Sequence, residues 1–113
     1  MTRDADWLRN PAALFDVRGK VAVVTGASGA FGSLASQVLA GAGARLVLSA
    51  GNEAALAVTA AACRDLGAQV VTVSGRPATQ RQCEAIMAAA IDAFGALDIL
   101  VVASGLNDPC PIT

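Results

Sequence analysis

The 113-residue sequence contains no histidine and no tyrosine, and aromatic residues make up only 4% of it. Without histidine, neither a serine–histidine nor a cysteine–histidine pair can activate a nucleophile. Without tyrosine, one frequent general acid is missing as well. No pair of carboxylates is obviously placed for acid–base work either. We therefore predict that this chain carries no catalytic residue of its own.

Cysteine is also sparse, and Cys63, Cys83 and Cys110 are widely spaced along the chain. They form no C-x-x-C pair, and with no histidine available they offer no ordinary zinc-binding set, so we predict no metal site. Free cysteine usually behaves as a small buried residue. We interpret all three as unpaired thiols in a reducing compartment.

Charge is low, because charged residues make up 15% of the chain and the net charge is −1. Such a chain has no electrostatic attraction to nucleic acid or to an anionic membrane, so we predict neither as a partner. The first 20 residues carry too many charged side chains for a signal-peptide core, and no apolar run approaches membrane-spanning length. We expect a cytoplasmic protein.

From residue 20 onward, short β-favouring runs alternate with helical stretches. Repeated strand–helix–strand units require right-handed crossovers and a parallel sheet. We predict an α/β fold of the Rossmann type, with three layers and a four-stranded parallel sheet in the order 3-2-1-4. The expected strands lie at 21–24, 45–49, 69–73 and 97–102, and the expected helices at about 31–42, 53–66 and 80–94.

Local signals mark the ends and faces of these helices. Asn52 is a plausible N-cap, and Thr79 with Gln82 resembles a capping box. In the first helix, apolar residues recur at intervals of three and four, which predicts one buried face. That face would consist of Phe31, Leu34, Ala35, Val38 and Leu39, and the earlier residues Trp7, Leu8, Leu14 and Phe15 would cover an edge of the core.

The turn after the first strand reads Thr25-Gly26-Ala27-Ser28-Gly29-Ala30-Phe31-Gly32. Its three glycines can permit a sharp turn, a close approach to a pyrophosphate, and tight packing of helix on strand. Amides at the start of a helix bind phosphates, and the Ser28 hydroxyl adds a donor. The alternative is that the glycines make only a tight turn. The context favours a dinucleotide site that includes Gly26, Ser28, Gly29, Ala30, Phe31 and Gly32.

Two further segments extend this pattern, Leu14-Phe15-Asp16-Val17-Arg18-Gly19-Lys20 and Ala93-Phe94-Gly95-Ala96-Leu97-Asp98-Ile99-Leu100-Val101. With the glycine turn, they make residues 14 to 106 resemble the short-chain dehydrogenase/reductase family. The resemblance implies binding of NAD or NADP, and hydride transfer to or from alcohols and ketones by a serine, a tyrosine and a lysine further along. This chain has no Tyr-x-x-x-Lys motif, so we predict a cofactor-binding portion that is inactive alone. It divides into a lead segment 1–19, a binding half-domain 20–106 and a tail 107–113.

The sequence departs from the family pattern at three places. The family's commonest glycine motif would place a glycine at Ala30, whose methyl group is expected to crowd the pyrophosphate slightly. The family's Asn-Asn-Ala-Gly appears as Val102-Ala103-Ser104-Gly105, which removes side-chain bonds that brace the sheet but leaves room for the adenosine ribose. The family's aspartate beside the adenine aligns with Arg76, a bulky cation.

The choice of cofactor depends on the end of the second strand, Ser49-Ala50-Gly51-Asn52. It has no acidic residue to bind the ribose hydroxyls of NAD, and it lacks the arginine that many NADP-dependent relatives carry there. Candidate contacts are Ser49, Gly51 and Asn52, although a strand end and a helix cap explain Ser49 and Asn52 equally well. A neutral strand end does not repel a 2′-phosphate, so the sequence favours NADP.

The predicted fourth strand would be an open edge, with two helices on one face of the sheet and one on the other. Such an edge invites self-association, and apolar surface would remain exposed. Three functions stay open: the cofactor-binding portion of an oxidoreductase, a non-catalytic dinucleotide-binding module, and a remnant without ligand. Ala30, Arg76 and Val102 are the features that favour the remnant.

Overall fold

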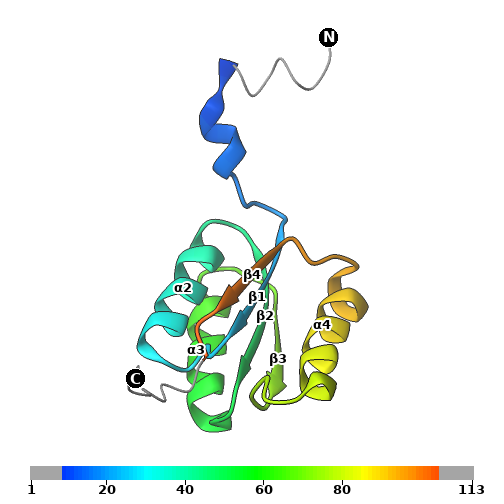
Figure 1. Ribbon diagram of the computed structural model, residues 1–113. Helices are drawn as coiled ribbons and strands as arrows, with labels where there is room; N and C mark the ends of the chain where they lie inside the picture. Colours follow the sequence, from blue (N-terminus) through cyan, green and yellow to red (C-terminus); the bar gives the residue numbers. More distant parts are fainter. Residues whose placement is uncertain (1–8, 105–113) are drawn as a thin grey trace, which may run out of the picture.

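The computed structural model describes residues 9–104. Its sheet has four parallel strands in the order β3-β2-β1-β4, with helices on both faces (Figure 1), so the predicted architecture and strand order are confirmed. The elements in chain order are η1 (Pro11–Phe15), β1 (Val21–Thr25), α2 (Ala30–Gly41), β2 (Arg45–Ala50), α3 (Glu53–Asp65), β3 (Val70–Ser74), α4 (Gln80–Phe94) and β4 (Ile99–Val102).

Two hydrophobic cores lie on opposite faces of this sheet. In β1, Ala22 and Val24 face the core beneath α2 and α3, whereas Val21 and Val23 face the core beneath α4. All five residues of β1 are buried, because the strand has a neighbour on each side and helices on both faces. This placement explains why the strand is a continuous apolar run rather than an alternating one.

The fourth strand begins at Ile99, two residues later than predicted. The reason is Asp98, whose carboxylate accepts a hydrogen bond from the Val21 amide at 2.9 Å. The Asp98 amide donates in turn to the Val21 carbonyl at 2.9 Å. The side chain of Asp98 therefore fixes the register of β4 against β1 before regular pairing starts.

The predicted helix caps are confirmed. The Asn52 side chain accepts a hydrogen bond from the Ala55 amide at 3.0 Å, and the Thr79 hydroxyl accepts one from the Gln82 amide at 3.2 Å. The Gln82 side chain accepts from the Ala78 amide, also at 3.2 Å, which completes an arrangement like a capping box. Gly95 ends α4 with a φ of 74°, a left-handed conformation that glycine adopts without strain.

The predicted buried face of α2 was wrong at three of its five positions, whereas Leu39 packs on the core beneath α2 and α3. Phe31, Leu34 and Val38 are all more than 60% exposed. The residues that face the sheet are small, namely Gly32, Ser36 and Ala40, and the hydroxyl of the buried Ser36 donates to the Gly32 carbonyl at 2.7 Å. Large side chains on this face would hold the helix away from β1. Close packing of helix on strand therefore decided the orientation of α2, which leaves Phe31, Leu34 and Val38 pointing outward.

The expectation for the lead segment was also wrong where it can be checked. Leu14 is 59% and Phe15 83% exposed, and η1 projects from the body of the molecule (Figure 1). Trp7 and Leu8 lie outside the described residues. Val17 packs on the core beneath α2 and α3, and the side chain of Arg18 lies against Gly43. These two residues already cover the edge of the core that Leu14 and Phe15 were expected to cover. No helix within residues 9–104 combines the length and apolarity needed to cross a membrane.

Two free cysteines of the described fold differ in how deeply they are buried. Cys63 on α3 is fully buried, and burial raises the pKa of its thiol, whereas Cys83 on α4 is half-buried. Only the thiolate reacts readily with alkylating reagents. In a Cys110→Ser background, we expect Cys63 to react with iodoacetamide on the order of 100-fold more slowly than Cys83. Peptide mass mapping measures both rates, and equal rates in the native state would contradict this packing.

Candidate functional site

An open pocket of about 640 Å³ lies beyond the carboxyl ends of the strands. Its volume is within the range of small-molecule and cofactor sites. It spans the point where strand order reverses, because β1 has β2 on one side and β4 on the other. Open α/β sheets bind their ligands at this place, where the loops after neighbouring strands diverge to opposite faces and leave a crevice.

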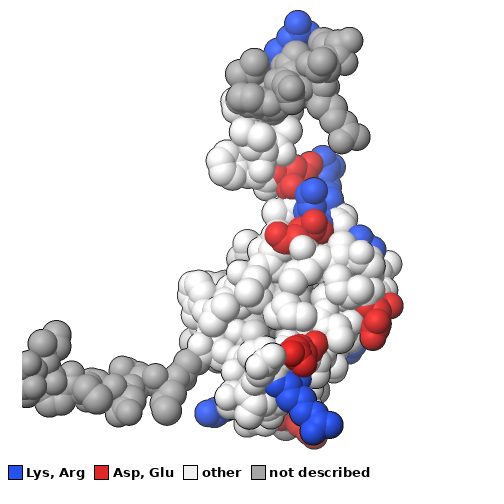
Figure 2. Space-filling model, turned by 45° about the vertical axis from the view of Figure 1, so that its right-hand side comes forward, with Lys and Arg blue, Asp and Glu red and all other residues white. Residues whose placement is uncertain are grey.

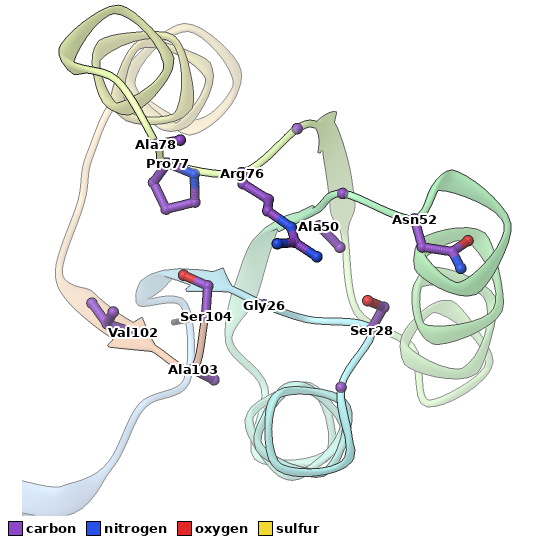
Figure 3. A pocket seen from close by; sticks show the side chains of 13 residues that line it. Gly26, Ser28, Ala50, Asn52, Arg76, Pro77, Ala78, Val102, Ala103 and Ser104 are labelled. Carbon is purple, nitrogen blue, oxygen red and sulfur yellow. The ribbon is translucent and has the colours of Figure 1, made fainter. Parts of the chain in front are cut away.

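Loops after all four strands contribute to the pocket (Figure 3). The lining residues are Gly26, Ser28 and Gly29 after β1, Ala50, Gly51 and Asn52 at the end of β2, Gly75, Arg76, Pro77 and Ala78 after β3, and Val102, Ala103 and Ser104 at the end of β4.

The glycine turn depends on two positions where no side chain can be accommodated. Gly26 has a φ of 69°, and a Cβ there would lie 2.6 Å from the Ala103 carbonyl carbon. A Cβ on Gly32 would overlap the carbonyl oxygen of Gly26. Gly29 differs, because a Cβ there would meet its nearest neighbour at an ordinary 3.5 Å. Gly26 and Gly32 thus bring β1, α2 and the end of β4 into direct backbone contact.

Amides with no protein acceptor gather at the start of α2. In the turn before it, the Ala27 amide donates to the Ser49 carbonyl and the Gly29 amide to the Gly26 carbonyl. The amides of Ala30, Phe31 and Gly32 make no hydrogen bond with any described residue. They form the first helical turn, where the positive end of the helix dipole lies, so they can hold an anion.

The end of β4 is fixed to β1 by side chains as well as by backbone. The Ser104 hydroxyl donates to the Thr25 hydroxyl at 2.9 Å, and Thr25 is 3% exposed. We had expected the loss of the two family asparagines to leave this place without side-chain bracing. Ser104 instead supplies a side-chain bond, and its small neighbour Ala103 leaves the pocket wall open.

Three polar residues near the end of β2 differ in their hydrogen-bond partners and in whether they line the pocket. Asn52 lines the pocket, but its side-chain oxygen caps α3. Ser49 is fully buried outside the lining, and its hydroxyl donates to the Gly75 carbonyl at 2.8 Å. The Glu53 carboxylate accepts a bond from the Ser74 hydroxyl at 2.6 Å and also lies outside the lining. Among the described residues, no carboxylate lines the pocket.

The structure therefore brings together most of the predicted site. Gly26, Ser28, Gly29, Gly51, Asn52, Ala103 and Ser104 line the pocket, whereas Ala30, Phe31, Gly32 and Ser49 do not, and Gly105 lies outside the described residues. Ala30 is exposed at the start of α2, where its methyl group does not narrow the pocket.

Our candidate contacts left out the loop after β3, which contributes Gly75, Arg76, Pro77 and Ala78, although the family resemblance had placed Arg76 beside the adenine. The rule that ligands bind beyond the carboxyl ends of all the strands would have indicated this loop.

Comparisons with known proteins agree on one family. The family model for short chain dehydrogenase matches residues 20–113. An uncharacterized oxidoreductase of Mycobacterium tuberculosis is 44% identical over 103 residues, which are 89% of this chain and 37% of that protein.

Solved structures of dehydrogenases are also similar to this chain. A hydroxysteroid dehydrogenase from Escherichia coli has a TM-score of 0.77 at 30% identity, and the match covers 84% of this chain and 40% of that one. A short chain dehydrogenase/reductase from Burkholderia phymatum in complex with NAD has a TM-score of 0.73 at 40% identity, and the match covers 76% and 31%. The chain spans roughly a third to two fifths of the length of these relatives.

The two glycines that follow Ala27 in the motif give a matched test of the turn. Gly32→Ala places a methyl group on the Gly26 carbonyl, so we expect it to lower the free energy of unfolding by at least about 2 kcal/mol. Gly29→Ala meets only an ordinary contact and should stay within about 1 kcal/mol of the wild type. Urea unfolding followed by circular dichroism measures both. Equal losses for the two variants would refute this description of the turn.

Proposed function

This chain belongs to the short chain dehydrogenase family, and from that premise we propose that residues 20–106 form a half-domain that binds a nicotinamide dinucleotide. The observation that carries the proposal is the glycine turn, which leads from the pocket directly into a helical turn with unpartnered amides. The similar structure from Burkholderia phymatum is a complex with NAD, which supports the proposal that this chain binds a dinucleotide.

The chemistry of the chain's own residues fits such a ligand. The amides of Ala30, Phe31 and Gly32, at the positive end of α2, would hold the pyrophosphate, and the Ser28 hydroxyl adds a donor nearby. The adenosine would lie between the end of β2 and the small residues Ala103 and Ser104. When bound, the nicotinamide would accept a hydride in its oxidised form or donate one in its reduced form.

For a complete dehydrogenase we propose hydride transfer between NAD(P) and an alcohol or ketone. The 113 residues contain no tyrosine, and they match only a minor part of each relative. We assign cofactor binding to this chain and the catalytic serine, tyrosine and lysine to polypeptide beyond it. This chain by itself is then expected to bind the cofactor without turning over a substrate.

We further propose NADP rather than NAD as the preferred cofactor. Selection of NAD in this fold depends on an acidic side chain at the end of the second strand, where it binds the ribose hydroxyls. Here that position is Gly51, and the nearby Glu53 is bonded to Ser74. No negative charge from the described lining would therefore repel a 2′-phosphate.

Isothermal titration calorimetry tests the proposal directly on the 113-residue chain. We expect a dissociation constant below about 1 mM for NADPH, which corresponds to about −4 kcal/mol, and weaker binding of NADH. Titration with nicotinamide mononucleotide, which lacks the pyrophosphate and the adenosine, serves as the control and should show little binding. No heat of binding with millimolar NADPH or NADH would reject the site.

We also propose that the 113-residue chain associates with itself through the β4 edge. On that side of the sheet, α4 packs against β1, β2 and β3 but not against β4. Leu100 is consequently 50% and Val102 66% exposed. Figure 2 shows a broad surface without Lys, Arg, Asp or Glu between the scattered charged side chains. An apolar, uncharged edge strand lacks the features that normally block pairing with another chain.

Light scattering coupled to size exclusion tests this proposal. We expect a mass above that of the monomer for the wild type, and a shift toward the monomer for Leu100→Lys, because an edge lysine disfavours pairing. Val58→Lys on α3, where Val58 is 71% exposed, is the matched control and should leave the mass unchanged. A wild-type monomer with a sharp, reversible thermal transition would contradict association.

A further inference from the structure

Gly51 and Arg76 share one region of space at the edge of the pocket. Gly51 does not have a positive φ, so its backbone conformation does not require glycine. A Cβ built on it would nevertheless lie 3.0 Å from Nε and 3.2 Å from Cγ of Arg76. The Arg76 side chain therefore fills the space that a side chain at position 51 would take, and it points into the pocket (Figure 3).

Hydrogen bonds from β2 fix the loop that carries Arg76. The Gly75 amide donates to the Ala50 carbonyl at 2.9 Å, and the Gly75 carbonyl accepts from the buried Ser49 hydroxyl at 2.8 Å. Gly75 has a φ of 118°, which only glycine adopts readily, and the Arg76 carbonyl accepts from the Ala78 amide at 2.8 Å. The backbone of Arg76 is therefore held at the end of β2, although it follows β3 in the chain.

The guanidinium of Arg76 has no anionic partner within the described part of the chain. It forms no salt bridge with residues 9–104, and none of the described lining residues is acidic. Glu53, which follows Gly51 by two residues, is bonded to Ser74 and lies outside the lining. A permanently charged, exposed cation thus faces a pocket whose described lining offers it no counter-ion.

The end of the second strand is where this fold recognises the adenosine ribose, through an acid on the 2′-hydroxyl or an arginine on a 2′-phosphate. We propose that Arg76 binds the 2′-phosphate of NADP here, reaching from the loop after β3 across Gly51. The planar guanidinium can donate two parallel hydrogen bonds to a phosphate. This role rests on the dinucleotide site proposed above, and it makes Arg76 the residue that determines cofactor specificity.

Two adenosine fragments isolate the contribution of the 2′-phosphate. We would measure dissociation constants of 2′,5′-ADP and 5′-ADP by calorimetry for the wild type and for Arg76→Ala, Arg76→Lys and Arg81→Ala. Arg81 is exposed on α4 outside the pocket lining and is the matched control. Circular dichroism of each variant checks that the fold is retained.

We expect the wild type to bind 2′,5′-ADP more tightly than 5′-ADP. Arg76→Ala should weaken binding of 2′,5′-ADP by roughly 10- to 100-fold and change that of 5′-ADP by less than about twofold. Arg76→Lys should keep part of the preference, because it retains the charge without the planar fork. Arg81→Ala should behave as the wild type.

Three results would overturn the proposal, and they have different consequences for the dinucleotide site. If 5′-ADP binds and the 2′-phosphate adds nothing, the role of Arg76 fails while the dinucleotide site stands. If Arg76→Ala tightens binding of both 2′,5′-ADP and 5′-ADP, Arg76 obstructs the adenine rather than binding the 2′-phosphate. If neither ligand binds the wild type, the dinucleotide site fails together with the role of Arg76.

Gly51→Ala gives a second, independent variant. Its methyl group would displace the Arg76 side chain by a few tenths of an ångström or more, so we expect it to reduce the preference for 2′,5′-ADP. In the double variant with Arg76→Ala, Gly51→Ala should have no further effect on that preference, because the two residues act through one contact. Additive losses would show that Gly51 acts independently of Arg76, against the proposal.

Discussion

The contact between the backbone of the β1–α2 turn and the first turn of α2 is the constraint on which the rest of the site depends. The Gly26 carbonyl lies where a side chain on Gly32 would stand, and the end of β4 lies where a side chain on Gly26 would stand. Because neither side chain exists, α2 starts directly beyond the end of β1. Its unpartnered amides then lie beside a pocket rather than over an apolar surface.

The same close packing determines the outer surface of the molecule. Gly32, Ser36 and Ala40 are small enough to lie against the sheet, which leaves Phe31 and Leu34 pointing outward. Apolar side chains are exposed on β4 as well, because α4 does not reach that strand. Larger side chains from the other elements, Leu46 and Leu48 on β2, Leu56 on α3 and Ile86 on α4, are buried in the cores. Small residues on α2 thus bring this helix close to the sheet, while leucine and isoleucine side chains of β2, α3 and α4 fill the rest of the cores.

The charge of the pocket lining depends on where the polar side chains near β2 lie and what they bond to. Ser49 anchors the loop after β3, Asn52 caps α3, and Glu53 is bonded to Ser74. Ser49 and Asn52 are uncharged, and the Glu53 carboxylate lies outside the pocket lining, so none of the three places a negative charge in the pocket. What remains at this edge is a positive contribution from Arg76 and the dipole of α2, which together suit an anionic ligand.

The sequence by itself determined the strands, the helix caps and the glycine turn, because periodicity, capping and the freedom of glycine act over a few neighbouring residues. The order of the strands followed from the general rules for βαβ units. Only the tertiary structure decided which face of α2 is buried, since that depends on how closely the helix approaches β1. It also decided the positions of Ser49 and Arg76. Ser49 bonds to Gly75, and Arg76 lies against Gly51. These partners are far apart in the chain, and the pairing of β2 with β3 brings them together.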